Sequence, residues 1–299
     1  DGWIVGVHTI LHWDGAAWAE VPCPEGAELS SVVAVSRVDA WAVGKGIVHW
    51  DGTAWSAVPA PVRNALAGVA MASPTDGWAV GNADTIMRWD GARWSTFATT
   101  NDAGLGLQSV ALVSATEGWA VGTRGVIMHL ADGGWSTIAK LRARGLRAVD
   151  MVSGADAWAV GEYGAIQHWD GAAWTAVASP TGALLYAVAM VSATDGWAVG
   201  DEGTILRWNG TAWLAVPSPT RATLRSVSVL APGDAWAVGS ETDGHGVTLH
   251  WDGASWDEVR SAAVGEAGRL LSVAMVASDD GWAVGYRDLS RNDTAPLVL

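Results

Sequence analysis

Residues 187–217 read AVAMVSATDGWAVGDEGTILRWNGTAWLAVP, a stretch in which four short apolar runs alternate with turn sequences. The turn Asn209-Gly210 suits a tight hairpin, because both residues tolerate a positive φ. Pro217 ends the last run, and its missing backbone N–H discourages pairing with another sheet. The stretch therefore predicts a unit of four antiparallel strands, which we call A to D in chain order.

The same unit recurs along the whole chain. The string Trp-Ala-Val-Gly, or a close variant, starts at intervals of 37 to 46 residues, at Trp3, Trp41, Trp78, Trp119, Trp158, Trp197, Trp236 and Trp282. This period is that of a four-stranded propeller blade, and no amphipathic stretch of about 10–15 residues indicates a helical solenoid. We therefore expect an all-β fold, a β-propeller of four-stranded antiparallel blades.

The number of blades depends on how the two ends of the chain meet. Strand A at 272–276 can complete the N-terminal strands B, C and D that begin at Trp3, which gives seven blades and leaves no free sheet edge. The remaining stretch, 282–299, resembles an extra strand B and strand C, and its entry into the ring would give eight blades. We expect residues 1–299 to form one propeller domain. The first residue is Asp1, which indicates a processed chain or a fragment of a longer protein.

All 21 tryptophans fall on three positions of the unit, where they open strand B, close strand C or open strand D. Sugar stacking is one use for such rings. Regular recurrence instead favours packing in the wedge between blades, where a large ring adds buried area. We therefore expect most strand B and strand C tryptophans to be buried.

The motifs Gly-Trp-Ala-Val-Gly, Gly-Thr-Ile-Leu and Trp-Asp-Gly-x-x-Trp resemble those of Asp-box (BNR-like) propellers, and most of all the photosystem II assembly/stability factor type of repeat. The Asp-box aspartate matches Asp14, Asp51, Asp90, Asp170 and Asp252, and Asn209 in the sixth repeat. The resemblance implies a structural aspartate. A short carboxylate in a turn can also accept backbone N–H bonds. Repeats of this type occur in exported proteins, so the resemblance implies an extracellular or cell-surface location.

Sialidases share the Asp box, but their chemistry requires an arginine triad, a tyrosine nucleophile with a glutamate partner, and an acid/base aspartate. The chain has no Arg-Ile-Pro motif, and Glu162 is adjacent to Tyr163 and expected to point elsewhere. Cys23 has no His or Asp beside it at a position that breaks the repeat. We expect no catalytic residues and no enzyme activity.

The net charge of −14 argues against nucleic-acid binding, and only Lys45 and Lys140 among the 17 basic residues are lysines. No run of about 18 apolar residues predicts membrane insertion. Five histidines precede the end of strand C, one per blade, which is too far apart for one metal ion: His12, His49, His129, His168 and His250. We expect them to bond a neighbouring turn, and we expect no metal and no cofactor.

One face of the propeller carries the variable B–C and D–A loops, whereas the A–B and C–D turns on the other face repeat monotonously. Around the channel, the residue before strand A is Ser30, Ala67, Gln108, Arg147, Tyr186, Arg225 and Leu271 in successive blades. The candidate ligand-binding residues are Gln108, Arg124, Arg147, Asp150, Tyr163, Tyr186 and Arg225. Two arginines beside a tyrosine suit a carboxylate or a phosphate with an apolar body. Alternatively, Asp150 pairs with Arg147 or Arg225 and neutralises the site.

The sequence favours a non-catalytic recognition scaffold that binds a protein partner through its variable face. The alternative is a lectin-like, carbohydrate-binding propeller, and a glycoside hydrolase of the sialidase type is disfavoured. A multivalent lectin should repeat its polar pocket residues as faithfully as its tryptophans, and the variable face does not.

Overall fold

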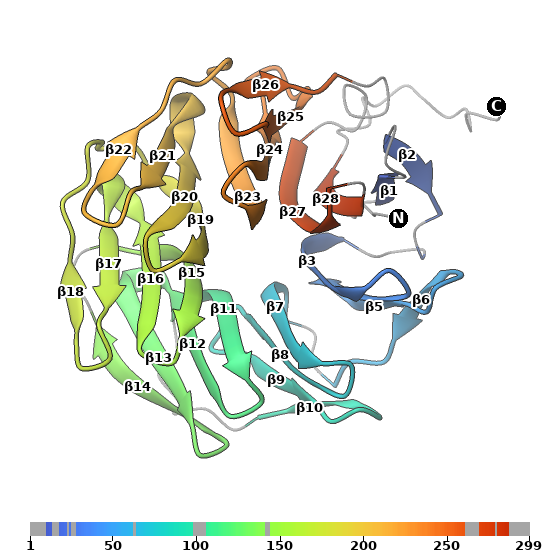
Figure 1. Ribbon diagram of the computed structural model, residues 1–299. Coiled ribbons are helices and arrows are strands. Elements are labelled where there is room, and N and C mark those ends of the chain that lie inside the picture. The colour runs from blue at the N-terminus through green and yellow to red at the C-terminus, as the bar shows by residue number, and fades with distance from the viewer. Residues whose placement is uncertain are drawn as a thin grey trace.

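The computed structural model describes residues 10–13, 18–22, 24, 28–61, 64–97, 106–140, 144–260, 269–278 and 280–286. Within these ranges the strands form seven four-stranded antiparallel sheets arranged around a central channel (Figure 1). Strand A of each sheet contacts strand A of the next sheet, and the last of these contacts the first. The sheets therefore form a closed ring of blades.

Each blade runs from strand A at the channel to strand D at the rim. The first three blades are β3 to β6 (Leu29–Ser36, Asp39–Gly44, Ile47–Trp50, Trp55–Val58), β7 to β10 (Leu66–Ser73, Asp76–Gly81, Ile86–Trp89, Trp94–Thr96) and β11 to β14 (Leu107–Ser114, Glu117–Gly122, Val126–Ala131, Gly134–Lys140). The next three are β15 to β18 (Leu146–Ser153, Asp156–Gly161, Ile166–Trp169, Trp174–Ala176), β19 to β22 (Leu185–Ser192, Asp195–Gly200, Ile205–Trp208, Trp213–Ala215) and β23 to β26 (Thr223–Ala231, Asp234–Ser240, Gly246–Trp251, Trp256–Glu258). The last blade is β27, β28, β1 and β2 (Arg269–Ala277, Asp280–Tyr286, Ile10–Trp13, Trp18–Val21).

The closing blade corrects the sequence-based assignment of the chain ends. Six blades are each made from one continuous stretch, and the closing blade takes its two inner strands from the C-terminal part and its two outer strands from the N-terminal part. Its strand B is β28, which contains Trp282, and not the stretch at Trp3, which lies outside the described residues. The alternative of eight blades is wrong, because Trp282 enters this blade and opens no further one. A short A–B turn joins β27 to β28, and such a local hairpin costs less loop entropy than pairing with the far end of the chain.

Strand B is buried on both faces because it lies between neighbouring blades. In β20, Trp197, Ala198 and Val199 have no solvent-accessible surface. Gly200 ends the strand where the backbone of the D–A loop passes over it, and a Cβ atom here would lie 2.2 Å from the Leu184 carbonyl oxygen. This contact explains the glycine at the end of each Trp-Ala-Val-Gly string.

The tryptophans join each blade to the next. The ring of Trp158 on strand B lies 4.6 Å from the ring of Trp208 and 5.5 Å from that of Trp213, both in the following blade. The same arrangement recurs for Trp41 and Trp119. Every described strand B tryptophan is buried, and those of strand C are buried or partly buried. The prediction that these rings are core residues is confirmed.

The Asp-box aspartates act as turn residues, as predicted. Asp170 Oδ1 accepts the N–H groups of Ala172 and Ala173, both at 2.9 Å. These bonds hold the pKa of the Asp170 carboxyl below its usual range. Matching pairs of bonds are made by Asp51, Asp90, Asn209 and Asp252. Asp14 lies outside the described residues.

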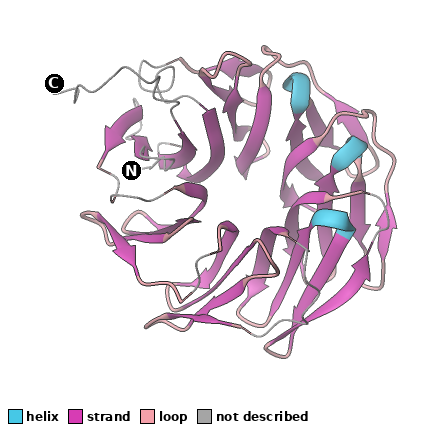
Figure 2. Cartoon of the chain, turned by 180° about the vertical axis from the view of Figure 1, so that it is seen from behind, coloured by secondary structure: helices cyan, strands magenta, loops and turns pink. Residues whose placement is uncertain are grey.

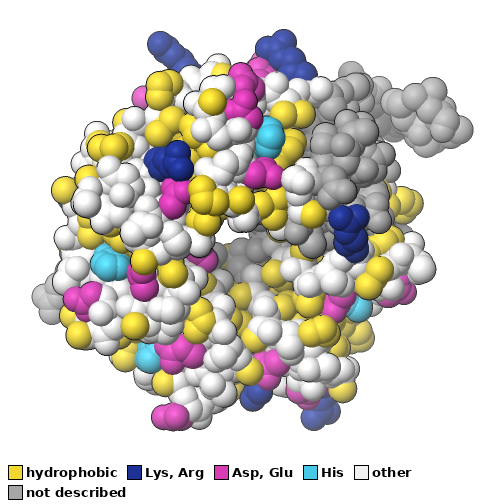
Figure 3. All heavy atoms as spheres, viewed as in Figure 1, with side chains coloured by type: hydrophobic (Ala, Val, Ile, Leu, Met, Phe, Trp, Pro, Cys, Tyr) yellow, Lys and Arg dark blue, Asp and Glu magenta, His cyan; other side chains and the backbone are white. Residues whose placement is uncertain are grey.

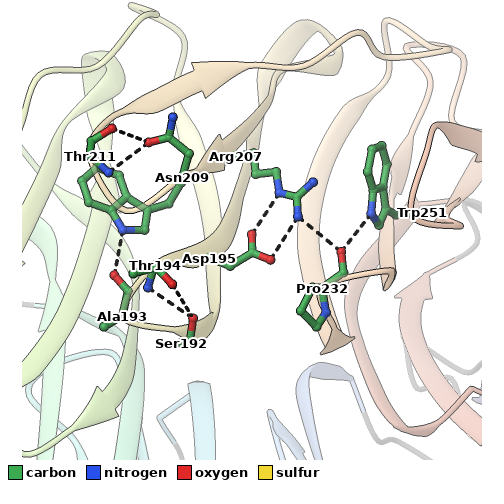
Figure 4. A network of polar contacts seen from close by, with 10 residues as sticks. Ser192, Ala193, Thr194, Asp195, Arg207, Asn209, Thr211, Pro232 and Trp251 are labelled. Carbon is green, nitrogen blue, oxygen red and sulfur yellow. Dashed lines mark hydrogen bonds and ion pairs between the residues drawn. The ribbon is translucent and has the colours of Figure 1, made fainter.

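The residue before the end of strand C bonds an acidic residue that opens strand B of the same blade. Figure 4 shows Arg207 bound through two nitrogens to the carboxylate of Asp195, at 2.9 and 3.0 Å. Four histidines make the equivalent contact with Asp39, Glu117, Asp156 and Asp234: His49, His129, His168 and His250. Their partner is therefore a side chain at the end of the A–B turn. His12 is not described at side-chain level.

No helix among the described residues is long and apolar enough to cross a membrane.

Candidate functional site

The residues at the second position of most A strands surround the mouth of the central channel. They line a cavity of about 250 Å³. Gln108, Arg147, Tyr186 and Arg225 come from four successive blades, and Leu271, Ser30 and Ala67 complete the circle. One half of the mouth is therefore lined by long polar or aromatic side chains and the other half by leucine and small residues. Figure 3 shows the central hollow from the other face. That this cavity binds a ligand stays a prediction.

Arg147 connects two blades across the mouth. Its Nη1 donates to Gln108 Oε1 at 3.5 Å, and its Nη2 lies 3.5 Å from Glu162 Oε1. Glu162 is fixed in turn, because its Oε2 accepts the Gly145 N–H at 2.9 Å. Glu162 was expected to point away from its neighbour Tyr163, and its contacts with Gly145 and Arg147 agree with this, but it was not among the predicted ligand-binding residues. Its position directly after the strand B glycine, where the loop returns over the start of strand A, was the available signal.

Arg225 is held by a ring and not by an acid. Its guanidinium carbon lies 4.9 Å from the centre of the Tyr186 ring, a cation–π contact. Within the described ranges it makes no ion pair. The Nε atoms of Arg225 and Arg147 are both buried without a hydrogen-bond partner among the described residues.

Asp150 belongs to the seam between two blades. Its Oδ2 accepts the Met190 N–H from the neighbouring strand A at 2.7 Å. Burial raises the pKa of the Asp150 carboxyl to about 6, although hydrogen bonds from backbone N–H groups oppose the shift. It makes no ion pair with Arg147 or Arg225, so the alternative of a neutralising pair is wrong. Asp150 does not line the channel cavity.

The same seam contact occurs elsewhere in the ring with a neutral side chain. Asp150 faces Trp158 across its strand pair, and Ser228 faces Trp236 at the equivalent place. Ser228 Oγ accepts the Met275 N–H at 3.0 Å, as Asp150 accepts that of Met190. Asp150 therefore connects two blades in the way that Ser228 does, whereas the equivalent residue of the other blades is alanine or valine.

Arg124 and Tyr163 lie on the B–C turns and not in the channel. Three successive blades form short 3-10 turns here (Figure 2): η1 (Thr123–Gly125), η2 (Glu162–Gly164) and η3 (Asp201–Gly203). The middle residues Arg124, Tyr163 and Glu202 have φ values of 57°, 57° and 56°. All three are exposed, and Tyr163 is 69% exposed. Because strand B ends beside the start of strand A, these turns and the channel mouth lie on the same face.

Among the residues with described positions, no group of three His, Cys, Asp or Glu side chains is placed to hold a metal ion. The donors at the channel mouth are guanidinium, amide, phenol and serine hydroxyl groups, which can bind an oxyanion. Cys23 lies outside the described residues.

The closed ring of tryptophan-rich units is a β-propeller, and part of it is similar to repeats of the photosystem II assembly factor type. Residues 47–144 match the sequence model of the family described as photosynthesis system II assembly factor YCF48. No curated protein matches the chain in sequence.

Solved structures share the fold at low sequence identity. YCF48 bound to D1 peptide is similar with a TM-score of 0.62 and 20% identity over 77% of each chain. YCF48 from Cyanidioschyzon merolae has a TM-score of 0.70 and 17% identity, covering 90% of this chain and 98% of that one. The WD40 propeller domain of Doa1 has a TM-score of 0.70 at 13% identity, with coverage of 87% and 93%. These likenesses show the propeller fold.

Proposed function

We propose that this propeller is a non-catalytic recognition scaffold that binds a protein partner through the face carrying the B–C turns. The observation that supports it is the series Arg124, Tyr163 and Glu202, which three successive blades hold at positive φ on one exposed face. A non-glycine residue in this conformation costs roughly 1–2 kcal/mol. Glycine would make the same turn without this cost, so the strain favours a role for the side chains.

The chemistry of these side chains suits a protein interface. Each differs from the others, whereas the turns on the opposite face repeat. Tyrosine and arginine are over-represented among residues that dominate binding energy in interfaces. Tyr163 is also one of the few large hydrophobic side chains that the described part of the chain exposes. The structure of YCF48 bound to D1 peptide supplies a precedent for a peptide ligand on a propeller of this repeat type.

Most tryptophan rings of the described blades are buried between blades, so they form no repeated platform for sugars. We therefore propose no carbohydrate ligand. The extracellular or cell-surface location stays a prediction, which fractionation of the producing cells tests.

The test is affinity capture with three versions of the chain. The first is unchanged, the second carries R124G, Y163G and E202G, and the third carries V38S in an A–B turn on the opposite face, where Val38 is 62% exposed. Glycine fits a positive φ, so the loop variant should fold normally. We expect a partner to be retained by the unchanged chain and V38S and lost from the loop variant. Identical captured proteins for all three versions would contradict the proposal.

A further inference from the structure

We infer that the channel mouth binds a single carboxylate of the partner, inserted along the channel axis between Arg147 and Arg225. This inference refines the proposed function, because the carboxylate belongs to the bound protein. It concerns the channel cavity, however, whereas the proposed function depends on the exposed B–C turns.

The charge at the mouth favours an anion. Arg225 contacts the Tyr186 ring and no acid among the described residues, although the chain as a whole carries a net charge of −14. The ion pair of Arg147 with Glu162 is long, at 3.5 Å between Nη2 and Oε1. The Glu162 carboxylate also accepts the Gly145 N–H. Among the described residues, the cavity lining includes two guanidinium groups and no carboxylate side chain.

The chemistry of the two arginines that line the cavity also suits a carboxylate. A guanidinium can bond both oxygens of a carboxylate in one plane, and its strongest hydrogen bonds are those to an anion. A carboxylate in the cavity would therefore lie beside two guanidinium groups of the lining.

The shape of the cavity limits the size of the ligand. A volume of about 250 Å³ lies slightly below the range of sites for drug-sized molecules and suits a group about the size of one residue. Leu271, Ser30 and Ala67 form the opposite wall and leave room beside the two arginines. The Tyr186 ring offers apolar contact next to Arg225. A carboxylate on a compact, partly apolar body fits this combination better than a bare inorganic anion.

Two sources of such a carboxylate exist in a protein partner, the chain terminus and an acidic side chain. Titration calorimetry with the whole chain separates them. N-acetyl-phenylalanine presents a terminal carboxylate, N-acetyl-aspartate amide presents a side-chain carboxylate, and N-acetyl-phenylalanine amide presents neither. Inorganic phosphate tests whether any anion suffices.

We expect at least one of the two acids to bind and the neutral amide and phosphate to bind at least tenfold more weakly. Arg225→Gln should raise the Kd of the acid about tenfold or more, because a charge-assisted hydrogen bond is lost. Arg221→Gln is the matched control: Arg221 is exposed in the D–A loop of the same blade and lies outside the cavity. It removes the same charge and should leave the Kd unchanged within about twofold.

Three results would overturn the inference: no binding of either acid at millimolar concentration, equal binding of phosphate, or an equal loss of affinity in Arg221→Gln and Arg225→Gln. The proposed function fails by a different result, since partner capture can depend on the B–C turns even when small acids do not bind.

Discussion

Replacing Asp150 with asparagine should stabilise the propeller at neutral pH. The folded protein raises the pKa of this carboxyl from its ordinary value of 3.8 to about 6, and the first cause is burial. The folded state therefore binds the proton more tightly than the unfolded state between these values. It follows that the contribution of Asp150 to stability is most favourable below pH 4 and is lost as the pH rises to 6.

The size of the effect follows from the same two values. The interval from 3.8 to about 6 corresponds to about 3 kcal/mol of destabilisation above pH 6. Asparagine keeps an oxygen that can accept the Met190 N–H, so D150N should recover much of this free energy. The difference between D150N and the unchanged chain should shrink toward zero near pH 4.

Urea denaturation between pH 4 and pH 8 measures this prediction. The matched control is S228A, which removes the equivalent seam bond to Met275 without a change in charge. It should cost about 1 kcal/mol with no dependence on pH in this range. A D150N variant that is less stable than the unchanged chain at pH 8, or a difference that does not change with pH, would refute the reasoning.

The other predictions concern the turns and the seams. Y163G should raise the free energy of unfolding by up to about 1 kcal/mol, because the positive φ no longer strains a side chain; an unstrained Tyr163 would show no gain. G200A should lower the free energy of unfolding by about 1–3 kcal/mol, because the added Cβ would contact the Leu184 carbonyl oxygen. G182A is the control and should leave this free energy unchanged, because a Cβ there meets no atom within 4 Å. D170A should lower the urea midpoint of unfolding. D170N should largely preserve this midpoint, because Asn209 makes the same bonds in its own hairpin. An equal loss in both variants would contradict the role of the Asp170 oxygen as the acceptor.

Much of the ring was predictable because the period and the order of the strands are local properties. Gln108, Arg147, Tyr186 and Arg225 were predicted to surround the channel mouth and do line one cavity, although they lie within strand A and not before it. The contact of Asp150 with Met190 was not predicted. No sequence signal shows how far the A strands of neighbouring blades are shifted relative to each other along the channel axis. Comparing Asp150 with Ser228 was the one available hint, since both positions lie opposite the strand B tryptophan.

The strand content of the closing blade was predicted wrongly for a related reason. The stretch at Trp3 and the stretch at Trp282 carry the same motif, so the repeat alone does not decide which one pairs with β27. The short turn between β27 and β28 decides it. The positive φ of Tyr163 was also missed, although the glycine that follows it marks the turn.

The closing blade also constrains the order in which the protein can be made. β1 and β2 leave the ribosome first, but their partner β28 is produced last, after all six continuous blades. β1 and β2 can pair with each other at once, but the edge of β1 that pairs with β28 stays open until β28 is synthesised. Removing β28 would remove the strand that joins β27 to β1, so the ring can be completed only after β28 has been translated.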